Sequence, residues 1–273
     1  MDRIRKALDL ARLERSRGLN DDLKPLPPSE TQSPQPLAQI VYTATQVFQP
    51  DPNTLESKRI VDSSKNEPAS VAFRMLRTQV MQRMDENGWR SIAILSPGAD
   101  DGKSTTAVNL AISLANDRRH TVLLVDCDLR QPAIAGAFGL NPRYGIDDVL
   151  RGDAHVGQCL YHPEAFDRLV VLPARGPLEN SSEALAGPQG RALIAELRGR
   201  YPERIIVFDL PPVLLADDAL AFLPLIECGL VVVAERETRR DELLRCMELL
   251  RNTPIVGTVL NKAVDVRYGY GYG

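Results

Sequence analysis

A glycine-rich segment with an adjacent lysine and serine is the part of the sequence best suited to chemistry. It reads LSPGADDGKSTTAVNLAISLA over residues 95–115, follows an apolar run and opens a stretch of helical character. Glycine lets backbone amides approach phosphate oxygens closely, and a helix N-terminus adds further donors. This context predicts a phosphate-binding loop for Mg-ATP, in which Lys103 reaches the β- and γ-phosphates and Ser104 binds Mg²⁺.

The loop departs from the pattern GxxxxGK[ST], because Pro97 stands where the first glycine is expected and Gly98 follows it. The alternative interpretation is a chance GKS at a helix start. The apolar run before the loop and two acidic motifs elsewhere in the chain count against that alternative. The residues predicted to contact the nucleotide in this loop are Gly98, Asp101, Gly102, Lys103, Ser104 and Thr105.

Two acidic motifs each follow an apolar run. LLVDCDLRQP contains Asp126 and Asp128, and IIVFDLPP contains Asp209. In an open parallel sheet, ligands bind outside the carboxyl ends of the strands, so the three carboxylates are expected to converge on the phosphate loop. One or two of them can hold Mg²⁺ directly or through water, and another can accept a proton from an attacking hydroxyl. A lone strand-end aspartate is more often a cap or turn residue, but three at one sheet edge favour function.

A further motif, GTVLNKA, lies outside these three and closes the last apolar run. The side-chain amide of Asn261 both donates and accepts hydrogen bonds, so it can bind the edge of a nucleotide base. A purely structural asparagine at a strand end is the competing interpretation.

The elements that would position these residues alternate along the chain. Near-continuous apolar strands separated by helices are typical of an α/β fold with a doubly wound, mostly parallel sheet, covered by helices on both faces. A helix is also predicted over residues 68–84. The predicted strands are Ser91–Leu95, Thr121–Asp126, Arg168–Pro173, Arg204–Asp209, Gly229–Ala234 and Ile255–Leu260.

Composition narrows the class of protein. The 273 residues carry a net charge of −3, which argues against a broad nucleic-acid-binding surface. The four cysteines are widely spaced and form no CxxC pair, as expected for reduced thiols in the cytosol rather than a disulfide or zinc framework. No apolar run reaches the roughly 18 residues that span a bilayer, and the first residues do not resemble a signal peptide. A cytoplasmic protein is expected.

The domain organisation predicted from the sequence has four parts. Residues 1–17 form a short amphipathic helix, and residues 18–54 form a proline-rich linker that cannot bury enough apolar surface to fold alone. Residues 55–262 form the phosphate-binding domain. Residues 263–273 form a flexible tail that ends RYGYGYG.

The three motifs, in this order, resemble those of the bacterial tyrosine kinases (BY-kinases) of exopolysaccharide and capsule synthesis. Their Walker A, Walker A′ and Walker B motifs match Gly98 to Thr105, Asp126 to Arg130, and Asp209 to Pro212. The resemblance covers about residues 57–262 and then the tail. It implies an ATP-dependent kinase that transfers the γ-phosphate to tyrosines of a C-terminal cluster, in trans within an oligomer. Here the cluster is Tyr268, Tyr270 and Tyr272.

The resemblance also implies individual roles. Lys103 stabilises the transferring phosphoryl group, and Ser104 and Asp126 hold Mg²⁺. Asp128 is the base for the incoming tyrosine hydroxyl. Asp209 orients Mg²⁺ or its water, and Arg130 places phosphate or supports Asp128. The alternative for the tail is a sticky terminus with no role.

Partners follow from the same resemblance. The family has a form fused to a membrane protein of the chain-length-determinant type, and a separate cytoplasmic form activated by the cytoplasmic segment of such a protein. The absence of a predicted membrane span places this chain in the second form. The resemblance implies a homo-oligomer, held at the inner membrane through its partner.

Three residues depart from the family's pattern. Val71 replaces the acid of an ExxRxxR motif that the family uses in ring-shaped oligomers, although Arg74 and Arg77 are present. Asp100 and Asp101 add negative charge beside the phosphates unless their side chains point outward.

Two competing functions remain. Partition or carrier-type ATPases usually have a second lysine five residues before the main one, where this chain has Gly98. A regulatory module could instead bind ATP and a membrane partner without phosphorylating anything.

Overall fold

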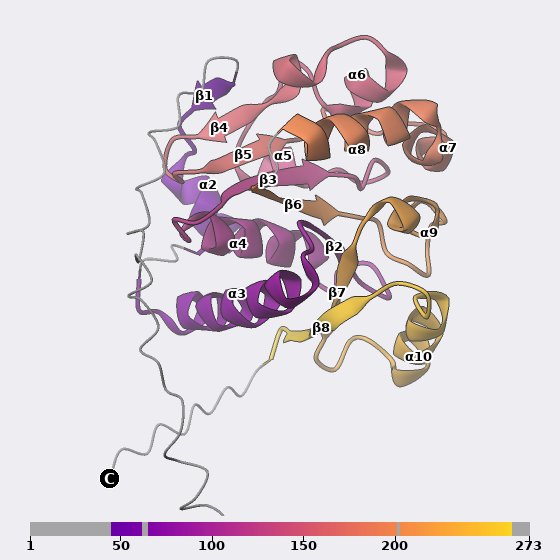
Figure 1. Cartoon of the computed structure of the whole chain (residues 1–273). Helices are drawn as coiled ribbons and strands as arrows, with labels where there is room; N and C mark the ends of the chain where they lie inside the picture. The colour runs from indigo at the N-terminus through magenta and orange to yellow at the C-terminus, as the bar shows by residue number, and fades with distance from the viewer. Residues whose placement is uncertain (1–44, 62–64, 201–202, 264–273) are drawn as a thin grey trace, which may run out of the picture. The chain divides into compact units, whose positions relative to one another are not determined.

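The computed structural model describes residues 45–61, 65–200 and 203–263 (Figure 1). These residues form an eight-stranded sheet with the strand order β1-β4-β5-β3-β6-β2-β7-β8. All neighbouring strands are parallel except β4 and β5. The strands are β1 (Gln46–Phe48), β2 (Ser91–Leu95), β3 (Thr121–Asp126), β4 (Tyr161–Pro163), β5 (Leu169–Leu172), β6 (Arg204–Asp209), β7 (Cys228–Ala234) and β8 (Ile255–Asn261).

Helices connect most of these strands, as the alternating sequence pattern predicts. They are α2 (Pro52–Ser57), α3 (Pro68–Asn87), α4 (Lys103–Ala115), α5 (Ile134–Ala137), α6 (Ile146–Arg151), α7 (Ser181–Ala186), α8 (Pro188–Arg200), α9 (Asp218–Phe222) and α10 (Arg240–Leu249). Two short 3-10 helices, η1 (Val156–Cys159) and η2 (Leu223–Leu225), complete the described elements.

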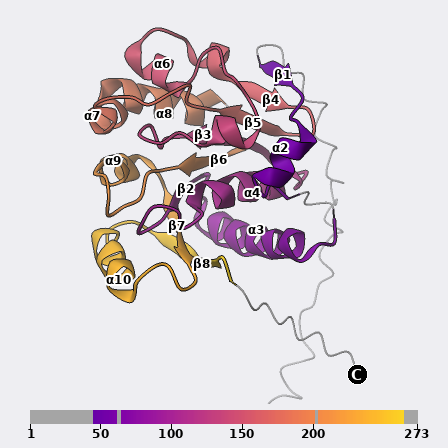
Figure 2. The same ribbon diagram turned by 180° about the vertical axis from the view of Figure 1, so that it is seen from behind.

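The sheet separates two apolar cores, because successive side chains of a strand point to opposite faces. In β2, Ile92 and Ile94 pack with helices α2 to α5, whereas Ala93 and Leu95 pack with helices α6 to α10. Figures 1 and 2 show these two helical layers on either side of the sheet. The predicted doubly wound α/β fold is therefore confirmed.

The ordered domain begins before residue 55, where the sequence predicted its start. Residues 46–48 form β1, which pairs with β4, and Phe48 packs edge to face against Phe138 at a centroid distance of 6.4 Å. Asp51 then caps α2 by accepting hydrogen bonds from the backbone and side chain of Thr54. Pro52 is one of the prolines that suggested a linker. It begins α2, at a position where no backbone amide donor is needed.

The predicted helix over residues 68–84 is also longer than expected. Helix α3 runs to Asn87 and ends at Gly88, whose φ of +69° suits glycine. Val80 and Met84 are buried, but Met75 is 47% exposed. Arg77 donates to the carbonyl of Ser113 in α4, so it ties the two adjacent helices together.

Some predicted segments lie outside the described residues: the helix over 1–17, the linker as far as residue 44, and the tail from residue 264 with its three tyrosines. Strand β4 and the short helices α6, α7 and α9 were not predicted, because each is too short to give a clear periodicity. A search of the described residues finds no helix with the length and apolar character of a membrane span.

Strand register brings the acidic motifs together. Asp126 ends β3 and Asp209 ends β6, and the two are direct Cα partners across these neighbouring strands. Strand β2, which leads into the phosphate loop, is the other neighbour of β6, with Ile94 opposite Asp209. The three motifs therefore meet at the carboxyl edge of the sheet, as a parallel arrangement requires.

Glu227 links the amino ends of β2 and β7, at the edge of the sheet opposite the acidic motifs. Its carboxylate accepts from the backbone amides of Arg90 (2.7 Å) and Ser91 (2.8 Å) and from the Ser91 hydroxyl (2.9 Å), and it forms an ion pair with Arg198. Partial burial works to raise the pKa of Glu227, but these hydrogen bonds outweigh burial and hold the pKa below its ordinary value of 4.5. Glu227 therefore stabilises the fold as an anion.

We expect Glu227→Gln to lower the free energy of unfolding by about 1–2 kcal/mol at pH 7, because the amide loses charge-assisted bonds. A group whose pKa is lowered by folding stabilises above its unfolded pKa, and that contribution is lost as the pH falls through the folded value. The gap between wild type and variant should therefore shrink below about pH 4.5. Urea unfolding at several pH values measures it, and a gap that does not change with pH would contradict this role.

Candidate active site

The phosphate loop lies between β2 and α4 and is shaped by one glycine. Gly102 has a φ of +88°, and a Cβ atom placed there would lie 1.8 Å from the side-chain nitrogen of Asn261. Only glycine fits this position. Helix α4 begins directly afterwards at Lys103, so its first backbone amides face the space that phosphates would occupy.

The carboxylate of Asp101 holds the loop from within. One oxygen accepts from the amide of Gly98 (2.9 Å) and the other from the hydroxyl of Thr238 (2.6 Å), a residue in the loop after β7. Asp101 is 4% exposed. The carboxylate of Asp101 is therefore occupied by contacts within the protein, and its predicted contact with the nucleotide stays a prediction. Asp100, in contrast, lines the pocket.

Asn261 connects β8 to the same loop. Its side-chain nitrogen donates to the carbonyl of Asp101 at 2.9 Å, and the residue also lines the pocket. The structural interpretation of this asparagine is thus observed, while its contact with a base stays a prediction. Thr238 was not predicted, because no local pattern marks a residue 137 positions from its partner.

Lys103 is buried between carboxylates from two strands. Its ammonium lies 2.8 Å from Asp209 and 3.2 Å from Asp128, and it contacts the Ser104 hydroxyl at 3.2 Å. Burial works to lower the pKa of Lys103, but Asp209 and Asp128 outweigh burial and raise the pKa above its ordinary value. The lysine is therefore charged and contacts the carboxylates that the sequence grouped with it.

The remaining acidic oxygens are suited to a divalent cation. Asp126 accepts from the amides of Ala133 (3.1 Å) and Ile134 (3.0 Å) through one oxygen. Its other oxygen and one oxygen of Asp209 are buried without a hydrogen-bond partner among the described residues. Burial, followed by the charge of Asp209, raises the pKa of Asp126 to about 8, and burial also raises the pKa of Asp209.

These two unpartnered oxygens fit a Mg²⁺ site, since Mg²⁺ binds one or two carboxylates and completes its shell with water and phosphate. The described residues contain no group of three His, Cys, Asp or Glu side chains that would hold a metal by themselves. Any Mg²⁺ here would thus depend on the nucleotide for part of its coordination.

Asp128 and Arg130 follow β3 but face different places. Asp128 is 6% exposed, lines the pocket and accepts from the amide of Gln131 at 3.1 Å. Arg130 donates to Asp218 (2.8 Å) and lies 3.4 Å from Asp217, both at the start of α9. It is outside the pocket lining, and its predicted part in placing phosphate stays a prediction. Arg130 instead anchors the segment that carries Asp128.

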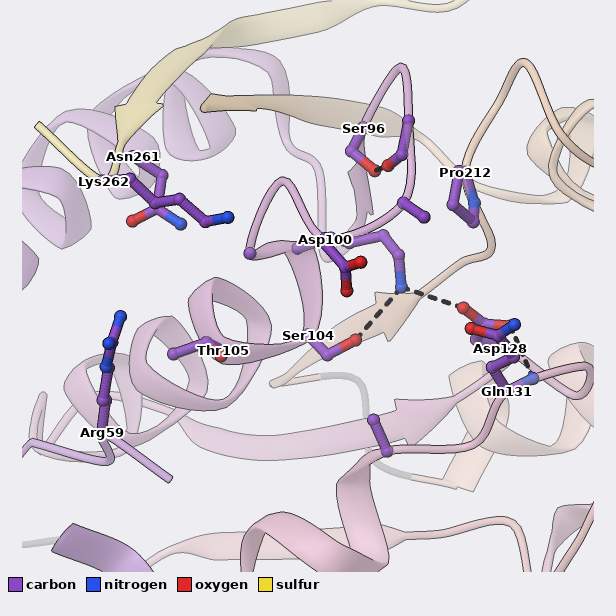
Figure 3. Close-up of a pocket in the computed structure, with 15 residues that line it drawn as sticks. Arg59, Ser96, Asp100, Ser104, Thr105, Asp128, Gln131, Pro212, Asn261 and Lys262 are labelled. Atoms are coloured by element: carbon purple, nitrogen blue, oxygen red, sulfur yellow. Dashed lines mark hydrogen bonds and ion pairs between the residues drawn. The ribbon is translucent and has the colours of Figure 1, made fainter. Parts of the chain in front are cut away.

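The pocket at this edge has a volume of about 540 Å³, within the usual range for small-molecule sites. Figure 3 shows Asp128, Gln131 and Pro212 at one end and Arg59, Asn261 and Lys262 at the other, with the phosphate loop between them. Sequence reasoning missed Arg59 because it follows the segment that was taken for a linker.

Comparisons with known proteins agree with this geometry. The family model described as the CobQ/CobB/MinD/ParA nucleotide binding domain matches residues 92–267. The tyrosine-protein kinase YwqD of Bacillus subtilis is 29% identical over 207 residues, which cover 74% of this chain and 85% of YwqD. The succinoglycan biosynthesis transport protein ExoP of Rhizobium meliloti is 32% identical over 212 residues, which cover 76% of this chain but 26% of ExoP.

Solved structures give the same picture. The chimerical protein CapA2B2 is 28% identical with a TM-score of 0.69, and the match covers 80% of this chain and 93% of that one. The cell division ATPase MinD of Pyrococcus furiosus is 30% identical with a lower TM-score of 0.54, over 66% of this chain and 73% of that one. The predicted relationship to bacterial tyrosine kinases of polysaccharide synthesis is confirmed by the relatives that bear these names.

We expect Thr238→Val to weaken binding of Mg-ATP about tenfold, because Asp101 loses a charge-assisted hydrogen bond that fixes the phosphate loop. Thr238→Ser keeps the hydroxyl and should bind like wild type. Isothermal titration calorimetry measures both affinities. If the valine variant bound Mg-ATP as tightly as the serine variant, the contact would not matter for the loop.

Proposed function

Because the chain belongs to the CobQ/CobB/MinD/ParA nucleotide-binding family and its relatives include tyrosine kinases, we propose that it is a protein-tyrosine kinase. It transfers the γ-phosphate of ATP to protein tyrosine, with its own C-terminal tyrosines as acceptors, and thereby regulates polysaccharide polymerisation or export. The observation that carries the proposal is the contact of buried Lys103 with Asp128 and Asp209 at the end of a phosphate loop.

The reaction follows from the placement of these groups. Lys103 exchanges its carboxylate partners for β- and γ-phosphate oxygens when ATP enters, and it stabilises the charge on the transferring group. Asp128, on the pocket surface, accepts the proton of the tyrosine hydroxyl. The phenolic oxygen forms a bond to the γ-phosphorus, and the bond from that phosphorus to the bridging oxygen of ADP breaks.

Ser104, Asp126 and Asp209 are the residues that would hold Mg²⁺, directly or through water. A bound Mg²⁺ would supply charge neutralisation on the phosphate oxygens. The two unpartnered carboxylate oxygens support this assignment.

The tail begins beside the pocket. Asn261 and Lys262 both line it, and Tyr268 follows Lys262 by six residues, at most about 20 Å of extended chain. That distance concerns the chain's own pocket and not that of a neighbouring chain, so Tyr268, Tyr270 and Tyr272 are proposed as acceptors on the family resemblance. We propose that transfer occurs in trans within a homo-oligomer, as the family resemblance implies.

The proposed partner is the cytoplasmic segment of a membrane protein of the chain-length-determinant type, with this chain in the cytoplasm beside the membrane. This chain spans about a quarter of the length of the Ralstonia and Rhizobium relatives, so those proteins have additional segments. A module that binds ATP and gates export without phosphotransfer is the alternative, and the following measurement separates the two.

We expect the purified chain with Mg-ATP and the partner's cytoplasmic segment to gain phosphate on its tail, measured by intact mass and anti-phosphotyrosine signal. Lys103→Met should abolish the gain, since it removes the charge at the transferring group. Phe at positions 268, 270 and 272 should remove most of the signal. Mixing wild type with a mass-tagged Lys103→Met chain should label the tagged tail, because transfer is in trans.

Binding of Mg-ATP without any phosphate gain would instead support the regulatory module. Undiminished activity in Lys103→Met would overturn the assignment of the phosphate loop. Label confined to the wild-type chain in the mixture would contradict transfer in trans.

A second variant tests the base. Asp128→Asn keeps the size of the side chain but cannot accept the proton, so we expect transfer to fall at least about 100-fold while calorimetric affinity for Mg-ATP stays within about threefold. Asp100→Asn, in the same pocket, serves as a control for the loss of one charge. Equal losses of binding and transfer in Asp128→Asn would assign Asp128 to metal or nucleotide binding.

A further inference from the structure

The residues at the two ends of the pocket indicate where the nucleoside lies, an inference that rests on the proposed function. The acceptor hydroxyl and the γ-phosphate must meet at Asp128, and the phosphates would lie against the phosphate loop and Lys103, which line the same pocket. The base and ribose therefore extend toward the other end, where Arg59, Asn261 and Lys262 line the wall. Lys262 forms an ion pair with Glu237, so Arg59 is the cation at this end that has no partner among the described residues.

Arg59 is held in an unusual backbone conformation. Its φ is +58°, which residues other than glycine and asparagine rarely adopt. Its carbonyl accepts from the side chain of Asn109 (3.0 Å), and the amide of Val61 donates to the same side chain (2.7 Å). Asn109 is fully buried in α4, the helix that starts at the phosphate loop. Arg59 is thus fixed relative to the phosphates.

The guanidinium of Arg59 is available to a ligand. It makes no hydrogen bond or ion pair with any residue that the structure describes, and the side chain lines the pocket on the side of Asn261 and Lys262 (Figure 3). None of the described residues lining this pocket is aromatic. A planar guanidinium stacks on aromatic rings, so it can take the place of an aromatic side chain against a purine.

We propose that Arg59 stacks on the base of the bound nucleotide and determines the preference of the site for nucleotides over base-free polyphosphates. A left-handed residue just after α2 is also a common way to end a helix. Ending the helix explains the backbone conformation of Arg59, although glycine would adopt that conformation with less strain. It does not explain why a cationic side chain lies in the pocket.

The test uses the full chain and calorimetric titration with Mg-ATP and, separately, with Mg-tripolyphosphate, which has the phosphates but no base. Glycine and asparagine both adopt a left-handed backbone conformation with little strain. The variants Arg59→Gly and Arg59→Asn should therefore keep the melting temperature of wild type. We expect both to weaken Mg-ATP binding about three- to thirtyfold and to leave tripolyphosphate binding within about twofold. Arg168→Gly is the matched control, because Arg168 has a φ of +65° and precedes β5 at the other end of the strands.

Unchanged ATP affinity in both Arg59 variants, with a wild type that binds ATP, would overturn the role of Arg59 and leave the nucleotide site standing. A parallel loss of tripolyphosphate affinity would also overturn base stacking, because it would place the guanidinium on phosphate. A wild type that binds neither ligand would overturn the proposed function itself.

Discussion

The contact between Lys103 and the carboxylates of Asp128 and Asp209 is the constraint on which the site depends. A buried ammonium is costly unless close opposite charges compensate for its lost hydration. The two carboxylates meet that requirement at 3.2 and 2.8 Å. They come from different strands, so the cation is satisfied only when the sheet has the observed order. Compensation of the Lys103 charge therefore depends on β3 and β6 being neighbours in the sheet.

The phosphate loop is likewise fixed by distant parts of the chain. Thr238 after β7 and Asn261 at the end of β8 both bind Asp101, and Asn261 fills the space that a side chain at position 102 would need. The last two strands of the sheet thus act on the loop that precedes α4. Asn261, which binds the loop, is followed by residue 262 and then by the segment that carries the proposed acceptors.

The pocket separates its charges along its length. Asp126, Asp128 and Asp209 gather where chemistry on the γ-phosphate would occur, and Arg59 and Lys262 stand at the opposite end. In the proposed site, Lys103 and Mg²⁺ would balance the charge of the phosphates beside these carboxylates, and Arg59 would offer a planar surface to the base. Arg59 lies two residues after the end of α2, a helix whose first turn belongs to the predicted linker, and it brings this part of the chain to the pocket.

The sequence alone determined six of the eight described strands, the sheet class and the residues of the three motifs, because each depends on local patterns of apolar and acidic residues. It could not determine that Asp101 turns inward, that Arg130 binds the start of α9, or that residues 46–54 join the domain. Short, proline-rich elements such as β1 and α2 are stabilised by partners far away in the chain rather than by their own periodicity. The direction of a polar side chain depends on which distant donor it meets, and only the tertiary structure brings those donors together.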